Sequence, residues 1–167
     1  YNIGYWPWEL TSLPPEWRFV FDLVDEVWAS SRFLVEVFSG LTDKPVILMP
    51  PLVAAPSAEP MDLAPFGIVP GNLVFLTMFD FNSFVARKNP QAAIAAFKAA
   101  FPERDGPERM IVKSLNAHAH PKRLEELQAE IGEDDRFVLI DGAFSRAEIG
   151  GLIAAVDCFV SLHRAEG

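Results

Sequence analysis

The sequence predicts an α/β protein built on parallel sheets, and three observations carry that prediction. After residue 70, apolar segments of strand length alternate with amphipathic segments of helix length. The loops between them are short, which is typical of parallel strands joined by right-handed helical crossovers. Before residue 50 a strand, a helix and a strand follow one another, and a proline-rich segment separates the two parts.

The part before the prolines is expected to form the end of one such unit. The proline pair at 14–15 can open a helix, because proline fits the first helical turn. The apolar stripe of that helix is Trp17, Val20, Phe21 and Val24. A buried strand at 26–29, a helix capped by Ser30 or Ser31, and a strand at 46–49 are expected to follow.

Seven of the fourteen prolines lie between residues 45 and 70. Proline lacks an amide donor and fixes φ, so this density excludes a long helix or a central strand. We therefore predict that one domain ends with residues 1–55, that 56–70 form a linker, and that 71–167 begin a second domain.

The second domain is predicted to follow the order β-α-β-α-β-α-β. Its strands are expected at 73–79, 110–113, 137–140 and 158–162. The first is an unbroken apolar run, which is typical of a strand covered on both faces. Its helices are expected to start at Pro90, at Pro121 and after Ser145. Ser145 and Glu148 match a capping box, and Cys158 is expected to be a small buried thiol in the last strand.

The composition excludes several classes of protein. Lys plus Arg is 14 and Asp plus Glu is 23, so the net charge is −9, which argues against a partner such as DNA or RNA. A single cysteine allows no intrachain disulfide and fits a reducing compartment. The longest uncharged run, 63–79, contains proline and glycine and is a poor membrane helix. We expect a cytoplasmic protein.

In an open parallel sheet, ligands bind beyond the carboxyl ends of the strands, and this rule selects four loops. The loops are 80–89, 114–116, 141–144 and 163–167. Arg87 and Lys88 come just before a predicted helix N-terminus, and Lys113 and Arg164 lie at the same edge. Such cations beside a helix dipole would suit a diphosphate. The alternative is a solvated basic pair at the start of a helix.

Other site types lack support. The sequence has no G-x-G-x-x-G after the first strand and no G-x-x-x-x-G-K-[ST], which disfavours a dinucleotide site and a P-loop. His118 and His120 could share a metal, but no Cys or third His accompanies them, and surface histidines are the better interpretation. The aromatic cluster at 1–8 is either core or the wall of a sugar-stacking cleft, and core is favoured.

Several segments resemble family 4 glycosyltransferases. The run FDFNSFVARKNP at 79–90, with the Ala-rich helix to Phe101, is similar to the first loop and helix of that family's donor domain. DEVWASSRF at 25–33 resembles the last strand–helix turn of the acceptor domain, and YWPWEL at 5–10 fits the same subfamily. SRAE at 145–148 and DCFVSLHRAEG at 157–167 resemble the approach to the family signature.

The resemblance implies a GT-B architecture, in which two Rossmann-like domains face each other across a cleft. This chain would supply the end of the acceptor domain and the first part of the donor domain. The implied activity is that of a retaining hexosyltransferase, which moves a hexosyl group from a nucleotide-diphosphate sugar to a glycan or glycoconjugate acceptor. No cofactor and no metal are expected, so cationic side chains and helix N-termini must neutralise the diphosphate leaving group.

The resemblance also assigns site residues. Arg87 and Lys88 match the diphosphate ligands, and Glu166 matches the first of the family's two acidic residues, which contacts the donor sugar or its phosphates. The region that meets the nucleotide and sugar comprises Asn82, Lys113, Asp141, Gly142, Phe144, Arg164 and Gly167. Trp8 and Glu9 are assigned to the acceptor cleft.

The family's second acidic residue would be at position 174, beyond this sequence. We therefore expect an internal fragment, inactive alone, of a bacterial enzyme that builds a surface polysaccharide or glycoconjugate, with peripheral membrane contact left open for the full-length parent. The alternative is a non-catalytic sugar-nucleotide or glycan-binding module on the same fold. An oxidoreductase or epimerase is disfavoured by the missing glycine fingerprint.

Overall fold

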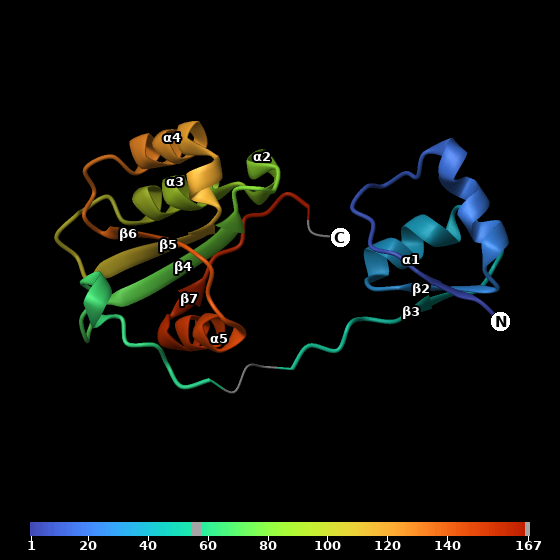
Figure 1. Cartoon of the computed structure of the whole chain (residues 1–167), viewed down its shortest axis with the longest axis horizontal. Helices are drawn as coiled ribbons and strands as arrows, with labels where there is room; N and C mark the ends of the chain where they lie inside the picture. Colours follow the sequence, from blue (N-terminus) through green and yellow to red (C-terminus); the bar gives the residue numbers. More distant parts are fainter. Residues whose placement is uncertain (55–57, 166–167) are drawn as a thin grey trace. The chain divides into compact units, whose positions relative to one another are not determined.

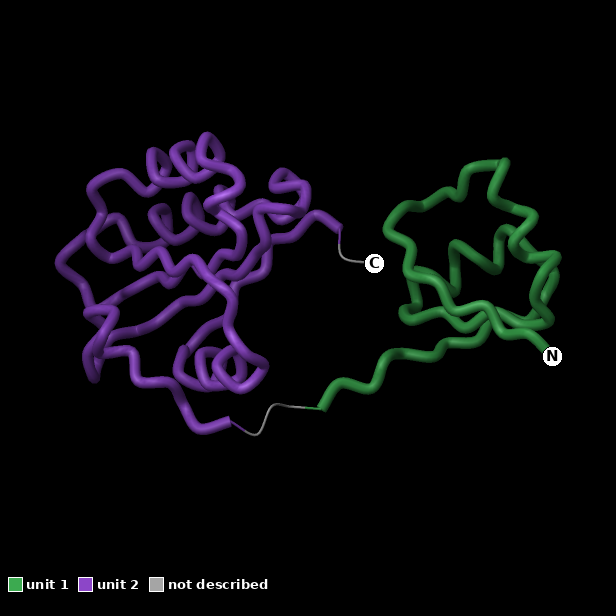
Figure 2. The backbone as a smooth tube through the Cα atoms, viewed as in Figure 1, with its two compact units in different colours: residues 1–55, 166–167 green, residues 56–165 purple. Residues whose placement is uncertain are grey.

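The computed structural model of the chain describes residues 1–54 and 58–165. These residues divide into two compact units, one within residues 1–54 and the other within 58–165 (Figure 2). Each unit is a parallel sheet packed against helices, so the chain has an α/β, Rossmann-like fold (Figure 1).

The first unit is a three-stranded parallel sheet in the order β1-β2-β3. The strands are β1 (Ile3–Tyr5), β2 (Glu26–Ala29) and β3 (Val46–Leu48). Helix α1 (Arg32–Ser39) begins where the Ser31 hydroxyl accepts a 3.3 Å hydrogen bond from the amide of Leu34. Leu34 and Phe38 of α1 are buried with Val27 of β2, which confirms the predicted strand, cap and apolar face.

Two features of the first unit differ from the prediction. The segment Pro15–Leu23 is a 3₁₀ helix, which has three residues per turn, so the predicted α-helical stripe does not hold along it. Phe21 is 4% exposed, whereas Trp17 is 50% exposed. Strand β1 was not predicted, because its three residues are too few to show a periodicity.

The second unit is a four-stranded parallel sheet in the order β6-β5-β4-β7. The strands are β4 (Leu73–Asp80), β5 (Glu108–Leu115), β6 (Phe137–Asp141) and β7 (Cys158–Phe159). The helices are α2 (Val85–Lys88), α3 (Pro90–Ala100), α4 (Pro121–Ile131) and α5 (Arg146–Ala155), with 3₁₀ turns at Ala64–Phe66 and Ala117–Ala119. No helix in the part of the chain that the structure describes is long and apolar enough to cross a membrane.

Helices α3 and α4 cover one face of this sheet and α5 covers the other (Figure 1). Leu152 of α5 is fully buried together with Leu63 and Ile68, which belong to the segment predicted as a linker. That segment approaches α5 closely, since the amide of Met61 donates a 2.9 Å hydrogen bond to the Gly151 carbonyl. A Cβ at Gly151 would lie 2.9 Å from the Glu59 carbonyl oxygen, so the contact depends on glycine there.

Three predictions for this unit need correction. Strand β7 has two residues instead of five, because it pairs with β4 only at Phe75 and Leu76. Cys158 is half-buried at this short strand, not fully buried. A helix begins just after Arg87 and Lys88 as predicted, but the two residues form the last turn of the short helix α2 instead of an open loop.

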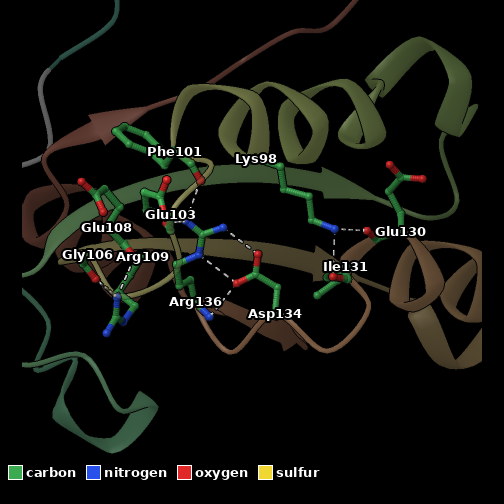
Figure 3. A network of polar contacts seen from close by, with 10 residues as sticks. All are labelled: Lys98, Phe101, Glu103, Gly106, Glu108, Arg109, Glu130, Ile131, Asp134 and Arg136. Atoms are coloured by element: carbon green, nitrogen blue, oxygen red, sulfur yellow. Dashed lines mark hydrogen bonds and ion pairs between the residues drawn. The ribbon is translucent and has the colours of Figure 1, made fainter.

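A buried ion pair closes the amino end of β6 (Figure 3). Arg136 and Asp134 are 2% and 4% exposed, and two bonds of 2.7 and 2.9 Å join the guanidinium to the carboxylate. The guanidinium also donates to the carbonyls of Phe101 and Glu103. This bonding lowers the pKa of Asp134 and raises that of Arg136. Each nitrogen of the guanidinium thus donates to at least one acceptor, which makes burial of the charges tolerable.

Asp134→Asn is expected to cost about 3–5 kcal/mol of unfolding free energy at pH 7, because it leaves a buried guanidinium without its counter-charge. The pKa of Asp134 is lower in the folded than in the unfolded chain. The stabilisation is therefore present above about pH 4 and is lost as pH falls through the folded value. Urea unfolding of both proteins from pH 7 downward checks this, and an undiminished difference at about pH 2 would contradict it.

Candidate functional site at the carboxyl edge of the second sheet

The strand register brings the carboxyl ends of β4, β5 and β6 together. Asp80 is paired with Leu115, and Ser114 is paired with Asp141, so three strands end at one edge. The loops that follow these strands begin the crossovers to the helices, and such an edge is where open parallel sheets bind ligands.

The Asp80 carboxylate organises the loop after β4. One oxygen accepts 2.8 Å hydrogen bonds from the amide of Asn82 and from the side chain of Asn116. The Asn116 bond is the main reason that the pKa of Asp80 is lowered. On the other side of the loop, Asn82 Oδ1 lies 2.9 Å from His120 Nε2. The loops after β4 and β5 are thereby bonded to each other.

Lys113 is 4% exposed and ties β5 to the loop after β6. Its ammonium group donates to the Ser114 carbonyl at 2.6 Å and to the Gly142 carbonyl at 2.5 Å, and it lies 4.5 Å from the centre of the Phe144 ring. Burial lowers the pKa of Lys113, and the charge of Asp141 opposes that shift. The lysine therefore holds the end of β5 and the loop after β6 together.

Asp141 also holds the edge together. Its Oδ1 accepts a 2.7 Å bond from the Ser114 hydroxyl and a 3.2 Å bond from the amide of Ala117. A hollow of about 350 Å³ opens between these loops. Phe144 and Ile149 give it apolar walls, and Asp80 and Lys113 are its charged lining residues.

Helix α2 is bonded to the segment after β7. The Arg87 guanidinium donates to the Ala165 carbonyl at 2.9 Å, and the amide of Arg164 donates to the Arg87 carbonyl at 2.8 Å. The Arg164 guanidinium donates to the carbonyl of Ala86. Next to this junction lies a second hollow, of about 450 Å³, which Arg164 and Arg123 line together.

The predicted donor residues therefore share one edge of the sheet. Asn82, Arg87 and Lys88 follow β4, Lys113 lies in β5 with Asp141 at the end of β6, and Gly142, Phe144 and Arg164 follow β6 and β7. Two groups form: Lys113 contacts Gly142 and Phe144, and Arg87 contacts the Arg164 backbone. Glu166 and Gly167 lie outside the described residues.

The predicted acceptor residues lie in the first unit. The Trp8 indole donates to the Ser12 carbonyl at 3.1 Å, and its ring meets Trp17 edge-on at 5.7 Å. Both rings line an apolar hollow of about 280 Å³ beside Trp6. Glu9 is exposed. The Trp8 ring thus packs against the core of the first unit and also lines this hollow.

Sequence reasoning placed Asp80 and Asn116 at this edge but gave neither a role. Asn116 has φ of 65°, and Asn is a residue that tolerates the left-handed region. The position of an Asn directly after a buried strand could have indicated this backbone conformation from the sequence. Within residues 1–54 and 58–165, no group of three or more His, Cys, Asp or Glu side chains is placed to hold a metal ion.

No protein-family profile and no curated protein matches the sequence. Solved structures share the fold of this chain. The apo structure of OtsA aligns with a TM-score of 0.63 and 13% sequence identity. The alignment covers 84% of this chain and 40% of the OtsA chain, so this chain spans well under half of OtsA's length. At that identity the likeness shows the fold alone.

Lys113→Met is expected to lower the free energy of unfolding by about 1.5–3 kcal/mol, because two carbonyls lose a charged donor while the apolar stem keeps its volume. Thermal and urea unfolding measure the loss. Lys122→Met, at an exposed position on α4, is the matched control and should change stability by less than about 0.5 kcal/mol. Equal stability of the Lys113 variant and the wild type would contradict the bonding described for Lys113.

Proposed function

We propose that the second unit binds the donor in a retaining glycosyltransferase of family 4, which transfers a hexosyl group from a nucleotide-diphosphate sugar to a glycan or glycoconjugate. The observation that carries the proposal is the junction of α2 with the segment after β7. It gathers Arg87, Lys88 and Arg164 at the carboxyl edge of a Rossmann-like sheet. The GT-B fold of OtsA, a trehalose-6-phosphate synthase, supports the class.

Charge explains why this edge suits a nucleoside diphosphate. The leaving group of the transfer is a diphosphate, and catalysis requires that its developing charge be neutralised. Arg87 and Lys88 are half-buried, and α3 begins two residues later with its amide dipoles directed back toward them. On this proposal the cations and the helix supply the neutralisation without a metal or cofactor.

The hollow beside Lys113 is assigned to the nucleotide and sugar. Its volume of about 350 Å³ falls in the range of small-molecule sites. Phe144 offers an apolar ring, while the carbonyls of Gly142 and Ser114 are fixed by the lysine. Glu166 would contact the donor sugar or its phosphates, as the family resemblance implies. Its substitution by Gln should separate catalysis from donor binding.

The acceptor is assigned to the first unit, where Trp8 offers an indole face of the kind that stacks on sugar rings. This chain spans 40% of the OtsA chain, so the transfer of the hexosyl group is proposed for the whole enzyme. The same proposal includes a bacterial, cytoplasmic enzyme of polysaccharide or glycoconjugate synthesis. Donor binding without any transfer by the full enzyme would favour the alternative, a non-catalytic sugar-nucleotide-binding module.

Arg87→Ala and Lys88→Ala are each expected to weaken nucleoside-diphosphate binding by about 1.5–3 kcal/mol, or roughly 10–150-fold, through loss of a charge-assisted phosphate contact. Calorimetric titration with UDP, GDP and ADP in turn measures the affinity. Arg104→Ala removes an exposed positive charge in the loop before β5, at the opposite edge, and should leave the affinity unchanged. Equal affinities for all four proteins would contradict the assignment.

A further inference from the structure

Four polar side chains join the end of β4 and the loop that follows it to the loop after β5, and the proposed function gives no role to the bonds between them. Asp80 Oδ1 accepts from Asn116 Nδ2 and from the amide of Asn82, each at 2.8 Å. Asn82 Oδ1 in turn lies 2.9 Å from His120 Nε2. We call Asp80, Asn82, Asn116 and His120 the inter-loop clamp.

The surroundings of the clamp hold its backbone as well. The Phe81 side chain is fully buried, and its ring stacks against that of His120 with 18° between the planes. The Phe81 amide donates to the Leu115 carbonyl at 3.0 Å, and its carbonyl accepts from the Arg123 guanidinium at 3.3 Å. Residues 80–82 are therefore fixed by β5, by the following loop and by α4.

The clamp lies where the rigid strand gives way to the basic helix. The amide of Ser83 donates to the Asp80 carbonyl at 3.0 Å and turns the chain, and α2 begins at Val85. The charges that act on the Asp80 carboxylate include Lys88 of α2 and His120. The clamp therefore lies at the point where the chain leaves the sheet toward Arg87 and Lys88.

We propose that Asn116 is a positioning residue for diphosphate binding: by holding Asp80, its side-chain amide fixes the loop that carries Arg87 and Lys88. This inference rests on the proposed function. The Asn116 side chain donates to Asp80, so we expect its effect on the two cations to pass through Asp80 and the loop.

The backbone conformation of Asn116 allows a variant that removes only the side chain. Its φ of 65° is favoured in glycine, so Asn116→Gly removes the amide without straining the backbone. Asn116→Asp places a second carboxylate at the 2.8 Å contact with Asp80 and should repel it. The matched control is Lys98→Met, which removes bonds to the carbonyls of Glu130 and Ile131 at the far end of α4 (Figure 3).

Two measurements on the whole chain test the inference. Hydrogen exchange reports on the loop without ligand, and we expect Asn116→Gly to speed exchange of the amides of residues 82–89 at least tenfold. Titration with UDP, GDP and ADP, well below the melting temperature of each variant, should show about tenfold weaker binding. Asn116→Asp should weaken binding further, whereas Lys98→Met should lower the melting temperature and leave both readouts unchanged.

The outcomes separate the two proposals. Unchanged exchange in Asn116→Gly overturns the clamp, and faster exchange with unchanged affinity overturns its positioning role. A loss of affinity in Lys98→Met equal to that in Asn116→Gly also overturns that role, because it would mean that lowered stability alone weakens binding. If the wild-type chain binds none of the three nucleotides, the proposed function fails, and the positioning role fails with it whatever the exchange rates show.

Discussion

The parallel pairing of β4 with β5 is the constraint on which the second unit depends. The register runs without interruption from Leu73 opposite Glu108 to Asp80 opposite Leu115. Because β6 and β7 join the same two strands in parallel, all four strands end on one side, and each following loop starts there. A slip of one residue in this register would move each side chain of the slipped strand to the opposite face of the sheet and separate Asp80 from Asn116.

The arginines at the two edges of this sheet differ in their exposure. At the amino edge, the Arg136 guanidinium is 2% exposed and its bonds go to Asp134 and to backbone carbonyls, so the charge serves stability. At the carboxyl edge, Arg87 and Lys88 are half-buried and Arg164 is exposed. Cations kept at the surface of a ligand-binding edge are the arrangement that an anionic donor requires, which is why the proposed function rests on this edge.

Much of the fold could be predicted because its signals are local. The caps at Ser31 and Ser145, the long apolar run of β4 and the helices opening at Pro90 and Pro121 all depend on neighbouring residues. The exceptions depend on distant ones. The length of β7 is set by its pairing with β4, and the burial of Leu63 depends on α5. At the site, the loops could be placed from topology, but the Asp80–Asn116 bond joins residues 36 positions apart.

Titration of the isotope-labelled chain with UDP, GDP and ADP, followed by amide chemical shifts, tests the central claim most directly, because it locates binding residue by residue. We predict that a nucleoside diphosphate shifts amides in 80–89, 113–120, 141–145 and 160–165, at the carboxyl edge of the second sheet. Shifts confined to the aromatic hollow around Trp8, or no shifts with any of the three nucleotides, would contradict the claim.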